Sequence, residues 1–285
     1  MKTANHVFAA ENPYDVFDLY LQSVFDAIAP RRLLLLLDEF DKIQDGIDSG
    51  ITSPQVPENL RALLHANPNM TAILCYSKLL RRLREEYWSM LFGLGHPVDV
   101  GSLDVEDARF LVTRPAEGRL VFTNKARDKI VDLCAHQPYL IQKLCNRIFE
   151  ISADKAQRTV TEQMVDSGSR MMTADDEHFA TLWQHHVGSE RRRFILSLCE
   201  RLSGSPDPIT RKLIEIKLEE ARIDIRRKQD LSDDLMHLRE LELLSMDESG
   251  STYRITVPLM EAWIRRNVDH EGQRSCAADE SEEKI

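Results

Sequence analysis

The chain contains few glycines, 11 in 285 residues, and their positions exclude one common motif. No glycine is followed by lysine, and no two glycines stand five positions apart. The phosphate-binding loop G-x-x-x-x-G-K-[ST] needs both features, because glycines let backbone N–H groups approach phosphate closely and the lysine contacts its charge. These 285 residues therefore contain no loop of that kind.

Paired cysteines and long apolar runs are also missing. The five cysteines are scattered and form no Cys-x-x-Cys pair. Four of them lie in apolar runs, which predicts small buried side chains in a reducing compartment: Cys75, Cys134, Cys145 and Cys199. No apolar segment is long enough for a signal peptide or a membrane span, so we expect a cytoplasmic protein without a membrane partner.

Basic charge is in the minority, since the formal net charge is −10. This balance argues weakly against a protein that coats nucleic acid, although a local basic face remains compatible with it. The hydrophobic fraction of 42% and the charged fraction of 29% are those of an ordinary soluble globular protein. The length suits roughly two domains of about 100–200 residues each.

The N-terminal third alternates apolar runs with amphipathic stretches, which predicts an α/β arrangement. Five consecutive leucines, Leu33 to Leu37, predict a central strand buried on both faces. The other predicted elements are a strand at His6–Ala10, a helix from Pro13 to Pro30, a loop at Asp45–Ser53, a helix at Pro57–Ala66, a strand at Met70–Tyr76, a helix at Lys78–Phe92 and a strand at Val98–Val100.

From Asp104 onward the apolar spacing is helical. Asp104 can cap a helix over Val105–Val112, and three further helices are predicted at Asn124–Ala135, Pro138–Ser152 and Thr161–Met172. A third block contains helices at Glu190–Leu202, Thr210–Ile223 and Leu231–Leu243, a β-hairpin over Leu244–Val257 and a helix at Leu259–Asn267. Three helices and a hairpin form the winged-helix pattern, and the Arg191-Arg192-Arg193 run is expected at the polar start of its first helix.

The acidic end of the leucine strand is the main candidate for chemistry. In P-loop ATPases, an apolar strand ending in Asp-Glu projects carboxylates toward the nucleotide. The first, Asp38, would hold Mg²⁺ mostly through water, and the second, Glu39, would polarise the attacking water as general base. The alternative is a buried strand that simply leads into a solvated acidic loop.

Four segments in this order make the first interpretation more specific: LLLLLDEFDKI, MTAILCYS, LDVEDARFLVTRPAEG and LCAHQPYLIQKLC. Together they resemble the AAA+/STAND group of P-loop ATPases over residues 5–268. The branch they resemble most is that of prokaryotic AAA-like ATPases, whose helical lid carries Gly-x-Pro-Tyr-Leu-x-Gln and is followed by a winged helix.

The resemblance implies an α/β fold with an incomplete P-loop NTPase parallel sheet, in which the Walker B and sensor strands are present and the P-loop strand is absent. An all-α lid and a winged-helix domain follow, with boundaries at 1–102, 103–180 and 181–270, and an acidic disordered tail at 271–285. The implied cofactors are ATP or ADP and Mg²⁺.

The resemblance also implies roles for single residues. Asp38 becomes the magnesium ligand, Glu39 the catalytic glutamate, and Ser77 the polar sensor of the γ-phosphate. Pro138 would pack near adenine. Arg81, like Arg82 and Arg84, would reach a neighbouring subunit's nucleotide, with a solvated helix face as the alternative.

The sequence departs from the family pattern in two places. His136 replaces the lid glycine, which restricts the backbone and puts the nucleotide contact of the lid in doubt. The missing P-loop strand would normally lie beside the sensor strand, whose edge would then be exposed. We expect either the downstream part of a split or truncated gene, which we favour, or a degenerate family member. Under both alternatives, we expect that the chain does not hydrolyse ATP by itself.

The expected function is part of an ATP-dependent molecular switch in signal transduction, with a protein partner or self-oligomerisation. The alternative is a non-enzymatic protein-interaction or DNA-binding regulatory module that uses the winged helix. DNA binding is disfavoured because the third helix begins with acidic residues and the wing, Asp247–Gly250, is acidic. Arg226, Arg227 and Lys228 precede this helix and could contact a phosphate backbone.

Overall fold

The computed structural model describes residues 13–76, 95–96, 98–154, 157–175, 177–223 and 228–268. The chain divides into two compact units, residues 1–99 and 100–285, and each is described by itself. The predicted strand at His6–Ala10, the predicted helix at Lys78–Phe92 and the acidic tail lie outside the described residues. No helix in the described ranges combines the length and apolar character needed to cross a membrane.

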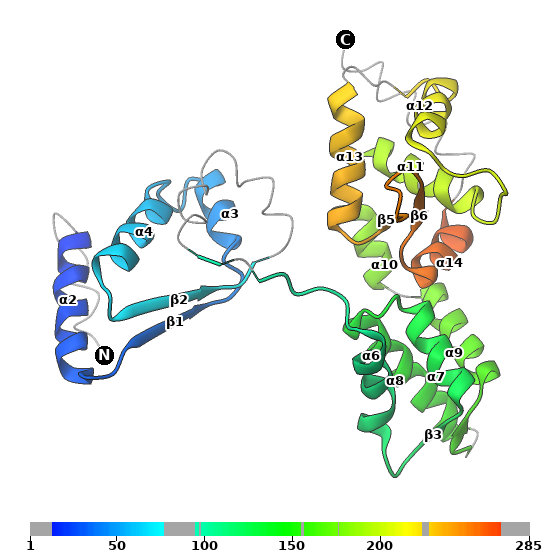
Figure 1. The fold of residues 1–285 in the computed structure, drawn as a ribbon, viewed down its shortest axis with the longest axis horizontal. Helices are drawn as coiled ribbons and strands as arrows, with labels where there is room; N and C mark the ends of the chain where they lie inside the picture. Colours follow the sequence, from blue (N-terminus) through cyan, green and yellow to red (C-terminus); the bar gives the residue numbers. More distant parts are fainter. Residues whose placement is uncertain are drawn as a thin grey trace. The chain divides into compact units, whose positions relative to one another are not determined.

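The first unit is built around two parallel strands (Figure 1). Its elements are α2 (Pro13–Ile28), β1 (Leu33–Leu37), α3 (Lys42–Asp48), α4 (Val56–Ala66) and β2 (Met70–Leu74). The elements α2, α4, β1 and β2 confirm two predicted helices and both long strands, but α3 occupies the start of the predicted loop at Asp45–Ser53. Aspartate and glycine disfavour helix, whereas the side-chain pairs Lys42–Asp45 and Gln44–Asp48 support this one.

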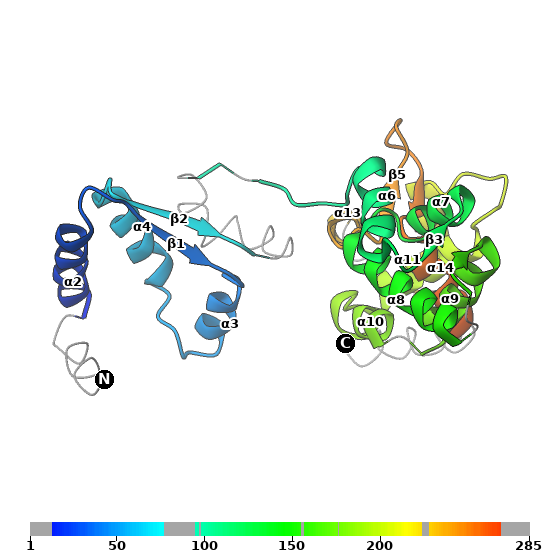
Figure 2. The same ribbon diagram turned by 90° about the horizontal axis from the view of Figure 1, so that it is seen from below.

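One face of the two-stranded sheet is covered by helices. Leu21 and Phe25 of α2 pack with Leu33, Leu35 and Met70 of the strands, and α4 adds Leu63 and Leu64 to this cluster. Figure 2 shows α4 running along the two strands. Phe40, which is 2% exposed, packs with Leu37, Leu60 and Leu74. Burying one such side chain contributes about 1.5–3 kcal/mol.

The prediction that β1 is buried on both faces is wrong. Leu34 is 51% exposed, Leu36 69% and Ile73 51%. Side chains alternate between the two faces of a strand, and in the described residues α2 and α4 cover only the face of Leu33 and Leu35. Cys75 is exposed as well, so the prediction that it is a core residue is also wrong.

The predicted strand at Val98–Val100 does not form. These residues have no regular structure, and Val98 and Val100 are 83% and 86% exposed. A strand requires partners for its backbone N–H and C=O groups, and within the described residues the sheet of this unit contains only β1 and β2.

The second unit begins with a helical bundle. Its elements are α6 (Val105–Thr113), the short helix η3 (Arg114–Ala116), β3 (Val121–Phe122), α7 (Asn124–Leu133), α8 (Pro138–Asp154), β4 (Thr159–Val160) and α9 (Glu162–Asp175). The predicted cap is confirmed, because the carboxylate of Asp104 accepts a hydrogen bond from the N–H of Asp107 at 2.8 Å. The strands β3 and β4 were not predicted, since two residues are too few to show a strand pattern.

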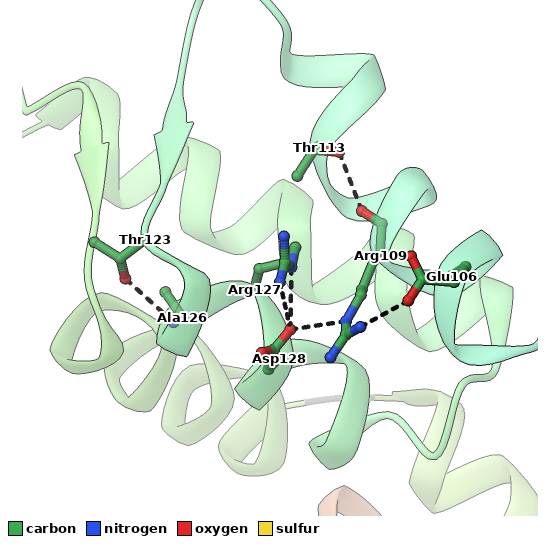
Figure 3. A network of polar contacts seen from close by, with 7 residues as sticks. All are labelled: Glu106, Arg109, Thr113, Thr123, Ala126, Arg127 and Asp128. Atoms are coloured by element: carbon green, nitrogen blue, oxygen red, sulfur yellow. Dashed lines mark hydrogen bonds and ion pairs between the residues drawn. The ribbon is translucent and has the colours of Figure 1, made fainter.

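A polar network joins α6 to α7 (Figure 3). The guanidinium of Arg109 donates to Glu106 at 2.8 Å and to Asp128 at 2.9 Å. Asp128 also accepts a hydrogen bond from Arg127, and these arginines, Arg127 first, lower the pKa of Asp128. Because the network lies at the surface, it aligns the two helices more than it stabilises them.

The remaining elements complete the second unit: α10 (Glu177–Thr181), the π-helix η4 (Leu182–His186), α11 (Glu190–Arg201), α12 (Arg211–Glu220), α13 (Lys228–Glu240), β5 (Leu244–Met246), β6 (Tyr253–Ile255) and α14 (Pro258–Asn267). The predicted hairpin is confirmed as the antiparallel pair β5–β6. One continuous apolar core runs from Ala108 to Ile264. Because this core continues on both sides of residue 180, it does not test the boundary predicted between residues 180 and 181, which stays a prediction.

The arginine run lies at the start of α11, as predicted, and two of its residues also bind a buried acid. Asp234 of α13 is 2% exposed, and its carboxylate accepts hydrogen bonds from Arg191 and, at 2.7 Å, from Arg192. Arg193 instead donates to the backbone carbonyls of Trp183 and Gln184 in η4. The three arginines thus connect α11 to both α13 and the π-helix.

Candidate functional site

The carboxyl end of β1 carries the two predicted acidic residues on an unusual backbone. Glu39 has a φ of 49°, in the left-handed region that residues with a Cβ seldom adopt. On one side, the Glu39 N–H donates to the carboxylate of Asp38 at 2.9 Å. On the other side, the N–H of Phe40 donates to the carbonyl of Cys75 at 2.9 Å. The burial of Phe40 and this bond to the β2 side hold Glu39 in its turn.

Asp38 and Glu39 are both exposed. They are followed by an acidic segment, in which a hydrogen bond from Lys42 to Asp45 at 3.0 Å raises the pKa of the lysine. Left-handed residues other than glycine cost about 1–2 kcal/mol and gather at functional sites. A strand that simply leads into a solvated loop does not require this left-handed backbone conformation at Glu39.

The fit to Mg²⁺ is partial. Carboxylate oxygens are suitable ligands, and Mg²⁺ is commonly bound by one or two carboxylates together with substrate phosphates and water. Within the described residues, however, no group of three or more His, Cys, Asp or Glu side chains could hold a metal ion. Asp38 and Glu39 can therefore contribute to a magnesium site but do not form one by themselves.

Two other predicted site residues, Ser77 and Arg81, lie outside the described residues, as do Arg82 and Arg84. The described part of β2 runs parallel to β1, with Leu74 opposite Leu37. The carboxyl ends of both strands therefore meet at the same edge of the sheet, the edge where Asp38 and Glu39 lie.

Pro138 belongs to the second unit, where it is exposed in the first turn of α8. The turn before it is left-handed, with φ of 46° at Ala135 and 62° at His136. The N–H of Leu103 donates to the carbonyl of His136 at 3.0 Å, and the His136 ring nitrogen Nδ1 lies 3.2 Å from the carbonyl oxygen of Leu103. The glycine-type backbone is thus retained with a histidine.

Sequence reasoning missed Glu242, which contacts the same turn from the C-terminal block. Its carboxylate accepts hydrogen bonds from the side-chain amide of Gln137 at 3.2 Å and from the hydroxyl of Ser102 at 3.4 Å. Glu242 itself has a φ of 57°. No local pattern marks this residue, because its role depends on a contact with residues more than a hundred positions away.

A surface depression of about 470 Å³ lies elsewhere, along α9. It is lined by Gln157, Thr161, Gln163, Met164, Asp166, Ser167 and Arg170, none of which belongs to the predicted site. Asp166 forms an ion pair with Lys129 at 2.7 Å. The depression therefore gives no better candidate than the end of β1.

Comparison with solved structures defines the class of fold. The ORC2 protein of Aeropyrum pernix, solved as ADPNP–ADP complexes, matches with a TM-score of 0.61 and 16% identity, over 96% of this chain and 71% of that one. The Walker-type ATPase PABY2304 of Pyrococcus abyssi matches with a TM-score of 0.55 and 13% identity, over 89% and 68%. No protein-family model and no curated protein matches the sequence.

The chain therefore has an α/β fold of the AAA+ P-loop ATPase type, with helical content and short parallel sheets. At these identities the likeness concerns the fold and does not extend to activity. The predicted AAA+ fold is thus confirmed, while the STAND assignment stays a prediction.

Proposed function

We propose that this chain is the downstream part of an AAA+/STAND-type, ATP-dependent molecular switch that does not hydrolyse ATP by itself. The observation that carries the proposal is the left-handed Glu39 beside exposed Asp38, at the carboxyl end of a parallel strand. Strand ends in α/β folds are where ligands bind. The lack of a phosphate loop in the 285 residues explains why turnover needs another segment.

In this proposal the chain supplies the water-activating side of the site. Asp38 would help to hold Mg²⁺, and the bound ion would offset the negative charge of the phosphates. Glu39 would polarise the attacking water. Ser77 senses the γ-phosphate, Pro138 packs near adenine, and Arg81 reaches a neighbouring nucleotide. ATP exchange would then rearrange the helical units and expose a surface for a protein partner or another copy.

The test measures Mg²⁺-dependent ATP hydrolysis. The purified chain alone should show none, and adding a phosphate-loop segment that binds it should produce turnover. Glu39→Gln should then lower that turnover by about 10²–10⁴-fold, because a general base is lost. Glu58→Gln is the matched control, since it removes one exposed carboxylate from α4 of the same unit.

Two results would contradict the proposal. One is hydrolysis by the purified chain alone that Glu39→Gln abolishes. The other is a reconstituted site whose turnover Glu39→Gln and Glu58→Gln reduce equally. A nucleotide-induced rise in melting temperature should accompany binding in the reconstituted protein.

A second candidate is a non-enzymatic regulatory module in which α11–α13 and the β5–β6 hairpin act as a winged helix. The turn of the hairpin favours a protein rather than DNA. Asp247 accepts hydrogen bonds from the Ser249 hydroxyl and from the N–H groups of Thr252 and Ser251, which hold its pKa below the usual range. A fixed negative charge at this turn would repel phosphate. This module should show no nucleotide-induced thermal shift.

A further inference from the structure

A second surface depression adjoins the one described along α9, because both are lined by Ser167 and Arg170. Helices α8 and α9 lie side by side in the second unit (Figure 2). The second depression has a volume of about 440 Å³ and takes three lining residues from each of these helices. We call it the α8–α9 groove, and its lining consists of Glu150, Ile151, Asp154, Ser167, Arg170 and Met171.

The groove is bordered by opposite charges. Glu150 and Asp154 stand four residues apart on α8, a spacing that puts both carboxylates on one side of the helix. From α9, the exposed Arg170 lies 3.4 Å from the Ser167 hydroxyl and forms no ion pair within the described ranges. The groove therefore has an acidic wall on α8 and a basic wall on α9.

Both helices also contribute an apolar side chain to the groove. Met171 of α9 is 47% exposed, and Ile151 of α8 is 8% exposed. A methionine side chain is unbranched and polarizable, so it can adapt to the shape of a partner. The groove therefore suits a helix with one apolar side chain at the centre of its contact face and opposite charges on the two sides.

The outer side of α13 carries this pattern. Met236 is 45% exposed. In a helix of about 3.6 residues per turn, Arg239 lies about 60° to one side of Met236, whereas Asp233 and Glu240 lie about 40–60° to the other side. Arg239 is exposed, and it has no ion pair with any residue that the structure describes. We call these four residues the α13 ridge.

The ridge and the groove belong to separate parts of the second unit. In both views α13 lies apart from α9 (Figure 1 and Figure 2). The inner sides of α8, α9 and α13 all contribute to one continuous apolar core. A single copy would have to break this core to bring its own ridge into its own groove, so the ridge can reach only the groove of another copy.

We infer that the α13 ridge of one copy of this chain docks in the α8–α9 groove of another copy. Met236 then packs on the apolar side chains of the groove, Arg239 faces its acidic wall, and Asp233 faces Arg170. Because the charges on the two sides differ in sign, they select one of the two directions in which the helix can lie in the groove.

Each such contact joins two different surfaces. Two copies can dock reciprocally, or several copies can follow one another in a ring or an open chain. One helix in one groove is a small interface, so the association is weak. Neither surface includes Asp38 or Glu39, so the inference goes beyond the proposed function and does not depend on ATP turnover.

Sedimentation velocity of the full chain without nucleotide tests the contact. Between about 1 µM and about 1 mM, a range that covers weak interfaces, the wild-type chain should form dimers or larger species. Arg170→Glu in the groove and Met236→Lys on the ridge should each raise the dissociation constant by about tenfold or more. Arg119→Glu is the matched control, because Arg119 is exposed and lies outside both surfaces.

Mixing the two variants shows whether the ridge meets the groove. Arg170→Glu keeps an intact ridge and Met236→Lys an intact groove, so an equimolar mixture should form a dimer with one chain of each kind. This rescue also shows that both variants are folded. A wild-type chain that stays monomeric, a variant that associates as tightly as the wild type, an equal loss in Arg119→Glu, or a mixture without the mixed dimer overturns the inference.

Discussion

At the scale of single residues, the left-handed turns matter most. Glu39 and His136 both occupy backbone conformations in which glycine is favoured, and both lie in segments that resemble the nucleotide-site motifs of the family. His136 stands in place of the family glycine, yet the structure keeps a φ of 62° there and places the ring near the carbonyl of Leu103. The ring contact offsets part of the strain that the Cβ creates.

This balance predicts different effects of two substitutions on stability. His136→Gly should change the free energy of unfolding by less than about 1 kcal/mol, because relief of strain offsets the lost ring contact and the larger unfolded-state entropy. His136→Val should lower it by about 1–3 kcal/mol, since a β-branched residue tolerates positive φ poorly. Urea denaturation followed by circular dichroism measures both, and an equal loss in the two variants would refute the explanation.

At the scale of elements, local sequence signals located most helices. Asp104, Thr123, Ser189 and Thr210 each accept a hydrogen bond from the N–H three residues later, and each lies at or beside a helix start predicted from sequence. Such caps are local, so the sequence reveals them. The π-helix η4 and the paired strands β3 and β4 were missed, the strands because two residues each are too few to show a pattern.

The arginine run on α11 shows the same limit at its partner. The sequence predicts a polar helix start, but only the fold brings Arg191 and Arg192 to the buried carboxylate of Asp234. Replacing Asp234 with an uncharged residue would leave the partly buried guanidinium groups of Arg191 and Arg192 without this carboxylate.

Asp234→Ala should therefore lower the free energy of unfolding by about 3 kcal/mol or more. Glu220→Ala is the control within the same unit, because it breaks the more exposed Lys217–Glu220 pair and should cost less than about 1 kcal/mol. Chemical denaturation compares the two variants. Similar losses would show that the buried acid does not fix α13 against α11.

At the scale of the whole molecule, the two compact units differ in the extent of their apolar cores. The core of the second unit is continuous from Ala108 to Ile264, whereas the described residues of the first unit form two small clusters on one side of the strand pair β1–β2. A two-stranded sheet is marginal without further cover.

A fragment of residues 100–285 should therefore fold by itself. Its near-ultraviolet circular dichroism should retain the signal of Trp183 and Trp263, whose ring centroids lie 6.0 Å apart in the core. Its melting temperature should match that of the same transition in the full chain. A fragment that loses this signal, or melts without cooperativity, would show that the second unit depends on the first.

The sequence by itself determined the order of the long helices and strands, the acidic end of β1 and the lack of a phosphate loop, because periodicity, caps and motifs are properties of neighbouring residues. Only the tertiary structure decided that Leu34, Leu36 and Cys75 are exposed, that Glu39 is left-handed, and that Glu242 contacts the turn before Pro138. Burial and long-range hydrogen bonds depend on which distant segments come together. Five leucines in a row predict a strand covered on both faces, but whether a helix covers each face depends on which other segments pack against the strand.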